Sequence, residues 1–327
     1  MKINDVIKKC IKIPGISIKQ AEYSMELILN TKEGKGSMTF FSLFPGLSLA
    51  YIFINSPTAP DLRSDSSITK GPLLLNYCVT GRCEMILNNK NFVYIKDREL
   101  SLTECFAQKE YVYPRRIYEG LEFFIDIDTF TLENTWVQNE FSIDFRKISK
   151  MFCPHGSTYI STATHETEEI LKKLWELYDF PASFAVIQMK IYTLALFSVL
   201  QNLEAIPKSQ ACTFFTESQV NIAKKVENII TSDLRLHHPA WELAEYFSIS
   251  ETSLKNYFRG VYGQNISVYL REMRMNKAGE LLASTRLSVA EIAAQVGYLN
   301  QSKFASVFKK HFGVSPLEYR RTRHLDS

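Results

Sequence analysis

Residues 241–258 read WELAEYFSISETSLKNYF, and residues 290–308 read AEIAAQVGYLNQSKFASVF. These two stretches decide the fold of the last third of the chain, because they state one pattern twice. The matched positions are Leu243 with Ile292 and Ala244 with Ala293 at an offset of 49, and then, at an offset of 50, Phe258 with Phe308, Tyr262 with Phe312, Gly263 with Gly313, Tyr269 with Tyr319 and Arg271 with Arg321. An internal repeat of this kind predicts two copies of one structural unit.

Each copy is typical of a helix-turn-helix. In the first copy Ser250 can cap the second helix, and in the second copy Gly297 suits the turn and Asn300 the cap. The spacing of apolar residues predicts one buried stripe along each helix. The stripe residues are Trp241, Leu243, Ala244, Phe247, Leu254, Tyr257 and Phe258 in the first copy and Ile292, Ala293, Val296, Phe304, Val307 and Phe308 in the second.

The opposite helix faces carry amides, hydroxyls and cations, the groups that read base edges and hold phosphates. A solvated polar face on an ordinary helical domain is the alternative, and the in-register repeat favours DNA. We expect Arg259, Lys303 and Lys309 to contact phosphates. The full set of expected DNA-binding residues is Thr252, Lys255, Asn256, Arg259, Asn300, Gln301, Ser302, Lys303, Ser306 and Lys309.

The doubled motif, a long connecting helix near residues 266–282, and the ending Phe308-x3-Phe312-Gly313-x-Ser315-Pro316-x2-Tyr319-Arg320 resemble the AraC/XylS transcription regulators. The resemblance covers about 105 residues. It implies a seven-helix domain whose two recognition helices enter adjacent major grooves on one face of DNA, and RNA polymerase as a partner. Ala305 and Ser306 stand where larger polar residues are common in that family, so the second copy is expected to read fewer bases.

Charge and composition agree with this interpretation. Residues 217–327 carry fifteen Lys and Arg against eleven Asp and Glu, a net charge of +4, whereas residues 1–216 carry a net charge of −1. No run of 18 apolar residues occurs, and the apolar stretch 191–203 is too short for a membrane span. The N-terminus lacks the apolar core of a signal peptide. We therefore expect a cytoplasmic protein.

The first half alternates short β-rich runs with turn residues, which predicts a sandwich or small barrel. The expected strands are 38–43, 47–54, 73–79, 84–87, 92–95, 101–105 and 122–127, with turns at Gly81 and at 88–91 and a helix over 18–29. Helices are expected over 145–152, 165–178, 182–203 and 219–231. The predicted fold class is α+β: a cupin-like β-barrel sensor domain with flanking helices over 1–203, a linker over 204–216, and an all-α DNA-binding domain over 217–327.

The chemistry of the first half favours binding over catalysis. A cupin-type metal site needs two or three histidines on adjacent strands, and only His155 and His165 precede residue 217, both after the strands. We therefore expect no metal, no cofactor and no enzyme. Cys78 and Cys83 flank a possible hairpin and permit a redox switch, although buried reduced thiols are favoured.

Aromatic side chains and arginines instead predict a small-molecule pocket for an anionic aromatic effector. The run Tyr77-x-Val79-x-Gly81-Arg82-x-Glu84, followed by Tyr118-Glu119-Gly120-Leu121, also resembles the siderophore-sensing, pyochelin-regulator branch of the family. The expected effector-binding residues are Tyr77, Arg82, Tyr113, Arg115, Arg116 and Phe123. Aromatic residues in strands are more often core, and that alternative stands for each of them.

The sequence thus predicts a DNA-binding transcription regulator, an activator, that responds to a small-molecule effector such as a siderophore. A regulator whose N-terminal half binds a protein partner is the second hypothesis, and a barrel enzyme fused to a DNA-binding domain is the third. Apolar faces of the helices over 165–203 predict a homodimer. Their residues are Leu171, Leu174, Trp175, Tyr178, Ile187, Ile191 and Leu194.

Overall fold

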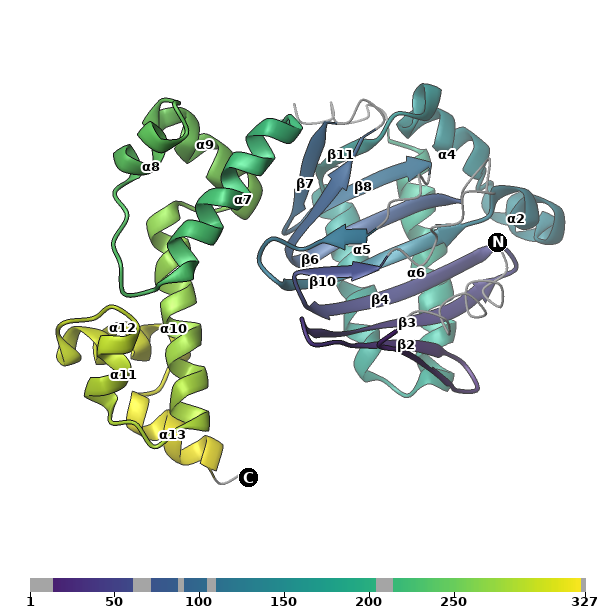
Figure 1. The fold of residues 1–327 in the computed structure, drawn as a ribbon. Coiled ribbons are helices and arrows are strands. Elements are labelled where there is room, and N and C mark those ends of the chain that lie inside the picture. Colours follow the sequence, from purple (N-terminus) through teal and green to yellow (C-terminus); the bar gives the residue numbers. More distant parts are fainter. Residues whose placement is uncertain (1–13, 61–71, 88–90, 105–109, 204–213, 325–327) are drawn as a thin grey trace. The chain divides into compact units, whose positions relative to one another are not determined.

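The chain separates into two compact units in a computed structural model that describes residues 14–60, 72–87, 91–104, 110–203 and 214–324. We call residues 1–214 the sheet unit and residues 215–327 the helical unit. The first half of the chain is a curled antiparallel sheet with helices, and the last third is helical (Figure 1). The predicted fold class is confirmed. Most of the expected linker, residues 204–213, lies outside the described residues.

The sheet unit contains eleven strands within the described residues, and every pairing between them is antiparallel. Their bounds are β1 Ile16–Gln20, β2 Met25–Asn30, β3 Lys35–Phe44, β4 Leu47–Asn55, β5 Thr58–Pro60, β6 Leu73–Ile86, β7 Phe92–Lys96, β8 Glu99–Glu104, β9 Glu110–Val112, β10 Ile117–Ile125 and β11 Tyr159–Thr162. The main path runs β1-β2-β3-β4-β10-β6-β8-β11, and β5, β7 and β9 extend from the far half of β6.

The long strand β6 belongs to both parts of the curled sheet. We predicted a turn at Gly81, and that prediction is wrong: one strand runs through this residue, pairing with β10 before it and with β7 after it. Gly81 has φ of 105°, and a Cβ atom there would lie 2.2 Å from the carbonyl oxygen of Ile117. Only glycine fits such a close approach, so Gly81 lets one strand pair in both parts of the sheet.

The helix predicted over 18–29 is also wrong, because these residues form the β1–β2 hairpin. The side chains of Met25, Leu27 and Leu29 are buried and alternate with less buried neighbours. This period of two residues is that of a strand. Pairing of β2 with β3 buries this apolar face, and that tertiary contact decides the structure.

Helices cover one face of the sheet. Their bounds are α2 Ile127–Glu133, α3 Thr135–Phe141, α4 Phe145–Phe152, α5 His165–Glu176 and α6 Ala182–Gln201. Figure 1 shows α5 and α6 behind the sheet, and their Leu171, Leu174 and Phe197 join its largest core cluster. The Tyr51 hydroxyl donates to the carbonyl of Leu174, which ties α5 to β4. Helices α4, α5 and α6 match the prediction within a few residues.

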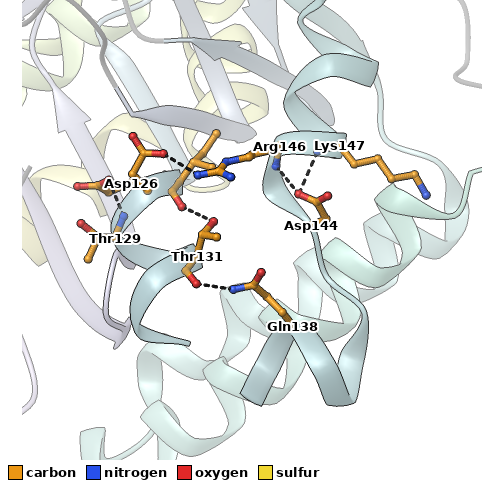
Figure 2. Close-up of polar contacts among 9 residues, drawn as sticks. Asp126, Thr129, Thr131, Gln138, Asp144, Arg146 and Lys147 are labelled. Carbon is orange, nitrogen blue, oxygen red and sulfur yellow. Dashed lines mark hydrogen bonds and ion pairs between the residues drawn. The ribbon is translucent and has the colours of Figure 1, made fainter. Parts of the chain in front are cut away.

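The short helices α2 and α3 were not predicted, and side-chain caps define where α2 and α4 begin. Asp126 accepts from the backbone N–H of Thr129 at 3.2 Å, and Asp144 accepts from that of Arg146 at 2.8 Å (Figure 2). Gln138 donates to the carbonyl of Thr131 at 2.9 Å and so joins α3 to α2. These caps satisfy N–H groups that the first turn of a helix leaves unpaired.

The other face of the sheet has its own apolar cluster, which includes Cys78, Cys83, Tyr113 and Tyr118. The sequence suggested that the two cysteines flank a hairpin. They do not face each other across one, because both lie on the single strand β6. Both are buried thiols, and burial raises the pKa of Cys78 above its usual range. The structure thus gives each of them a place in the core.

Helix α6 is the one described helix whose length and composition would suffice to cross a membrane, with 20 residues and a mean hydropathy of 1.6. It begins at Ala182, so the apolar segment is longer than the stretch 191–203 that we judged too short. Its Met189, Leu196 and Phe197 are fully buried in the core of the sheet unit.

The helical unit consists of seven helices within the described residues. They are α7 Glu217–Ser232, α8 Ala240–Tyr246, α9 Glu251–Tyr262, α10 Ile266–Ser284, α11 Val289–Gln295, α12 Gln301–Phe312 and α13 Pro316–His324. In Figure 1, α10 runs along this unit, with α8 and α9 toward one of its ends and α11 and α12 toward the other. The connecting helix expected over 266–282 is therefore present.

Candidate nucleic-acid interface

The first helix-turn-helix is α8, a turn and α9. The turn residue Ser248 has φ of 53°, and the Ile249 N–H donates to the Ala244 carbonyl at 3.1 Å. Ser250 caps α9 by accepting from the N–H of Ser253 at 3.1 Å, as predicted. Trp241 was expected in the buried stripe, but it is 59% exposed. Helix α8 has only seven residues, and Trp241 at its second position turns away from the contact with α9.

The second helix-turn-helix, α11 and α12, repeats this construction. Ser288 and Glu291 form a capping box at the start of α11, and Gly297 has φ of 79° in the turn. The Tyr298 N–H donates to the Ala293 carbonyl at 2.8 Å, and Asn300 accepts from the N–H of Lys303 at 2.9 Å. Asn300 therefore caps α12, as predicted, and this uses the side-chain oxygen of a residue that we also counted among the DNA-binding residues.

Both second helices are held by the same triangle of aromatic rings. In the first copy the ring centroids of Phe258, Tyr262 and Tyr269 lie 4.6, 5.5 and 4.8 Å apart. In the second copy Phe308, Phe312 and Tyr319 give 4.6, 5.4 and 4.8 Å. Each triangle joins the C-terminal end of a helix-turn-helix to the following helix, α10 or α13. The sequence repeat at an offset of 50 is thus a repeat of packing.

The polar residues that the sequence placed on the outward faces are exposed on α9 and α12. The exposed residues are Thr252, Lys255, Asn256 and Arg259 on α9 and Gln301, Ser302, Lys303, Ser306 and Lys309 on α12, while Ala305 is half-buried. They form one accessible face on each helix, opposite the buried residues Leu254 and Phe304. These side chains are therefore accessible from solvent on one face of each helix.

The two faces differ in charge. On α9 the Lys255 ammonium forms an ion pair with the carboxylate of Glu251 one turn earlier, which reduces the positive charge of this face. On α12 no residue between Gln301 and Phe312 is acidic, and Lys303, Lys309 and Lys310 are exposed. A polyanion would therefore meet a stronger positive potential at α12 than at α9.

Arg274 on α10 connects the two helix-turn-helix motifs. Its Nε and Nη2 atoms donate to the carbonyls of Leu234 at 2.8 Å and Leu236 at 3.0 Å, in the segment that leads into α8. Its guanidinium also lies 5.9 Å from the ring centroid of Tyr298, in the turn of the second motif. Burial lowers the pKa of Arg274. The sequence did not indicate the contacts of Arg274 with Leu234, Leu236 and Tyr298, because this residue lies in the middle of a predicted helix.

Gly297 lets the second motif come this close. A Cβ atom there would lie 2.6 Å from the Leu234 carbonyl oxygen and 2.9 Å from the Arg274 guanidinium carbon. The segment before the first motif and the turn of the second are therefore in direct contact, with Arg274 between them. We expect this contact to fix the separation of α9 and α12.

The effector residues expected in the sheet unit do not form one group. Tyr77 and Phe123 belong to the core that α5 and α6 cover, and the Phe123 and Phe197 rings lie 5.6 Å apart. Tyr113 belongs to the cluster on the other face, where its ring lies 5.2 Å from that of Tyr118. Burial raises the pKa of Tyr77 to about 12, so it stays protonated.

The arginines expected near the effector lie on β6 and on the turn before β10. Arg82 is 9% exposed and lies 5.3 Å from the ring centroid of Tyr94, whose hydroxyl donates to Glu84 at 2.6 Å. Burial lowers the pKa of Arg82, and Arg115 lowers it further. Arg116 has φ of 62° and donates to the carbonyl of Glu33. Neither Glu84 nor Tyr94 was in the expected effector set, since both have ordinary strand spacing.

Among the described residues, no group of three or more His, Cys, Asp or Glu side chains is arranged to hold a metal ion. His155 lies in a short 3-10 turn at 154–156 with φ of 57°, next to the buried Cys153.

Comparison with known proteins places the helical unit in a family. Residues 243–322 match the family model described as a helix-turn-helix domain. The chain carries an AraC-type helix-turn-helix domain. This AraC-type domain contains both motifs, the connecting helix α10 and most of α13.

Relatives of the chain include two bacterial regulators. The transcriptional regulator SirC of Salmonella typhimurium (strain SL1344) is 32% identical over 128 residues, which are 38% of this chain and 43% of SirC. The HTH-type transcriptional activator CfaD of Escherichia coli is 30% identical over 176 residues, which are 53% of this chain and 62% of CfaD. The matched parts thus span less than two thirds of either relative.

A solved structure, the C-terminal domain of AraT, a response regulator from Geobacillus stearothermophilus, is 37% identical to this chain. The matched region covers 31% of this chain and 85% of the AraT domain, with a TM-score of 0.30.

The contact at Arg274 can be tested by substitution. In Arg274→Met the carbonyls of Leu234 and Leu236 lose a charged donor, and we expect the backbone N–H groups of Leu236 and Tyr298 to exchange with deuterium about tenfold faster or more. Hydrogen exchange followed by mass spectrometry measures this. The control is Lys277→Met, one turn along α10, where the ammonium only pairs with Glu280 at 3.1 Å. Equal exchange in both variants would show that Arg274 does not hold the two motifs together.

Proposed function

We propose that the protein is a sequence-specific transcription regulator, an activator, whose helical unit binds duplex DNA through α9 and α12. The observation that carries this proposal is the pair of exposed polar helix faces on two identically supported motifs. The activator role is supported by the description of CfaD as a transcriptional activator. In this proposal the protein acts in the cytoplasm, RNA polymerase is its partner at the promoter, and it has no enzymatic activity.

The dimensions of the AraC-type domain suit two consecutive groove segments. Helix α10 has 19 residues and is therefore about 28 Å long. Consecutive major-groove segments on one face of DNA lie about 34 Å apart, so α9 and α12, near opposite ends of α10, can enter both (Figure 1). One polypeptide would then cover an asymmetric site of about two helical turns.

Base reading is assigned to the residues near the start of each recognition helix. We assign it to Thr252, Lys255, Asn256, Gln301 and Ser302, whose exposed side chains supply amides, hydroxyls and a cation. Arg259, Lys303 and Lys309 are assigned to phosphates. The ion pair of Lys255 with Glu251 has to open before Lys255 can bind a base, which weakens its contribution.

Substitutions on the two kinds of residue should have different effects on a duplex selected from a random pool by the full chain. Gln301→Ala or Asn256→Ala should cost about 1–3 kcal/mol on the selected duplex and little on a scrambled one, because base contacts carry specificity. Lys309→Ala should weaken both duplexes alike and lower the salt slope by about one. Titrations at several salt concentrations measure both effects.

The control for charge loss is Lys147→Ala, an exposed lysine of the sheet unit (Figure 2). It should leave both affinities and the salt slope unchanged. If Gln301→Ala lost affinity equally on both duplexes, α12 would be a phosphate clamp and its assignment as a reader would be wrong.

For the sheet unit we propose an effector pocket for a small aromatic anion, such as a siderophore, near Arg82, Tyr113 and Arg115. The proximity of Arg82 and Arg115 supports an anion, because a bound negative charge would interact favourably with both guanidinium groups, in addition to the carboxylate of Glu99 that already lies near Arg82. The nearby rings of Tyr113 and Tyr118 support an aromatic ligand. Tyr77 and Phe123 are left out, because both lie in the core under α5 and α6.

Thermal unfolding of the full chain with aromatic carboxylates and catecholates tests the pocket. A true ligand at 100 times its dissociation constant stabilises by about 2.7 kcal/mol, and we expect Arg115→Gln to abolish this gain. Uncharged analogues of the same compounds serve as the control and should give no gain. If no anion stabilises the wild type at millimolar concentration, the alternative gains support: the sheet unit is controlled by a protein partner.

We also propose a homodimer through α6. Leu171 and Leu174 of α5, which we counted toward an interface, are fully buried against the sheet, whereas Ile187 and Ile191 of α6 are 58% and 54% exposed. Phe184, 49% exposed, extends this stripe at a spacing of three residues, and the ring of Phe180, which precedes α6 and is 52% exposed, lies 5.9 Å from that of Phe184. A stripe with this spacing is the seam by which helices pair.

The dimer is tested by light scattering at tens of micromolar protein. We expect the wild type to have the mass of two chains, and the double variant Ile187→Glu with Ile191→Glu to have the mass of one, because two charges would be buried in the seam. Leu132→Glu is the control, since Leu132 is 77% exposed on α2. A monomeric wild type, with and without DNA, would rule out this interface.

A further inference from the structure

A hollow of about 790 Å³ lies in the helical unit between α11, the start of α12 and the segment that joins α7 to α8. One wall is made by Ala290, Ala293 and Ala294 of α11, and the opposite wall carries Arg235 and His237. Arg274 forms part of the lining, where its guanidinium is held by the carbonyls of Leu234 and Leu236.

The hollow adjoins the proposed reading face of the second motif. Gln301, the first residue of α12, lines it, and so does Leu299, which is fully exposed just before the cap of that helix. In a helix-turn-helix bound to DNA the second helix lies in the major groove and the first helix crosses the backbone. The first helix here is α11, and its alanines leave space along the surface that faces Arg235.

The charge of the hollow suits a phosphate. The ten residues that line it include two arginines and a histidine, and none of the ten is acidic. The Arg235 side chain is 66% exposed. Its guanidinium donates two hydrogen bonds to the carboxylate of Asp233, from Nε to Oδ1 at 2.9 Å and from Nη2 to Oδ2 at 2.6 Å. Hydrogen bonds from Arg235 lower the pKa of Asp233 to about 2, so the carboxylate stays charged at neutral pH.

We propose that this hollow receives the sugar–phosphate backbone of DNA beside α11, with the sugar against the alanines and a phosphodiester against Arg235 and His237. The proposal rests on the proposed function, since it adds a backbone contact to the DNA complex of α9 and α12. Arg235 exchanges Asp233 for the phosphate, and Asp233 opposes binding because its negative charge remains beside the incoming phosphate.

Asp233 and Arg235 should therefore act in opposite directions on DNA affinity. We expect Arg235→Ala to weaken binding of the full chain about three- to tenfold on selected and scrambled duplexes alike, and to lower the salt slope by about 0.9. Asp233→Asn should strengthen binding about threefold on both duplexes, because the amide removes a charge but can still accept from the N–H of Arg235.

The sheet unit supplies a matched pair of control variants. Arg146 and Asp128 form an exposed ion pair at 3.1 Å, so Arg146→Ala and Asp128→Asn make the same charge changes outside the helical unit. Because both residues belong to the sheet unit and not to the helical unit, neither variant should change the affinity or the salt slope. A loss of affinity in Asp233→Asn would show that the pair only supports the segment before α8, which overturns the proposal.

A second arm separates the DNA backbone from a free anion. Inorganic phosphate is added to the full chain without DNA, and thermal unfolding is followed for the wild type and Arg235→Ala. Stabilisation by phosphate through Arg235, together with an unchanged DNA salt slope in Arg235→Ala, would mean a free-anion site and overturn the backbone contact. Failure of the wild type to bind any duplex would overturn the proposed function itself, whereas an unchanged Arg235→Ala on a binding wild type overturns this inference alone.

Discussion

Aromatic packing between the end of each helix-turn-helix and the helix that follows it holds both recognition helices in place. The two triangles of rings agree within 0.1 Å in every centroid distance. A recognition helix can only read bases if its support is rigid, because misplacement removes hydrogen bonds that depend on direction. The AraC-type domain meets this need twice with one arrangement, in which Tyr269 and Tyr319 supply the ring from the following helix.

The same constraint explains why α10 is central to the domain. It supports the first motif through Tyr269, it passes under the second motif at Gly279, where a Cβ atom would lie 3.0 Å from the ring of Phe312, and its Arg274 joins the two. We therefore expect the separation of α9 and α12 to depend on α10 and on the Arg274 guanidinium, which lines the hollow.

Local patterns predicted most of the helical unit, because its helices are amphipathic and their caps are contiguous in sequence. Ser250, Gly297 and Asn300 each have the predicted role in the structure. Arg235 and Arg274 were missed as site residues, since their partners lie on other elements and a single helical or loop position carries no sign of them. The predicted burial of Trp241 was wrong, because a helix of seven residues has too few turns to determine which face is buried.

The sheet unit was harder to predict, because strand pairing is decided by contacts far apart in sequence. The strand β6 continues through Gly81 only because β10 and β7 pair with its two halves, and residues 18–29 form strands because β3 covers them. The proposed effector residues divided between two faces for the same reason: Tyr77 and Tyr113 look alike in sequence, and the curl of the sheet separates them.

Hydroxyl-radical footprinting of the full chain on a duplex selected from a random pool tests the central claim most directly. The account predicts two protected backbone segments on one face of the duplex, about one helical turn apart, and it predicts the same pattern for the double variant Ile187→Glu with Ile191→Glu. A single protected segment, or two segments that disappear in that variant, would contradict the claim that one polypeptide presents two recognition helices to DNA.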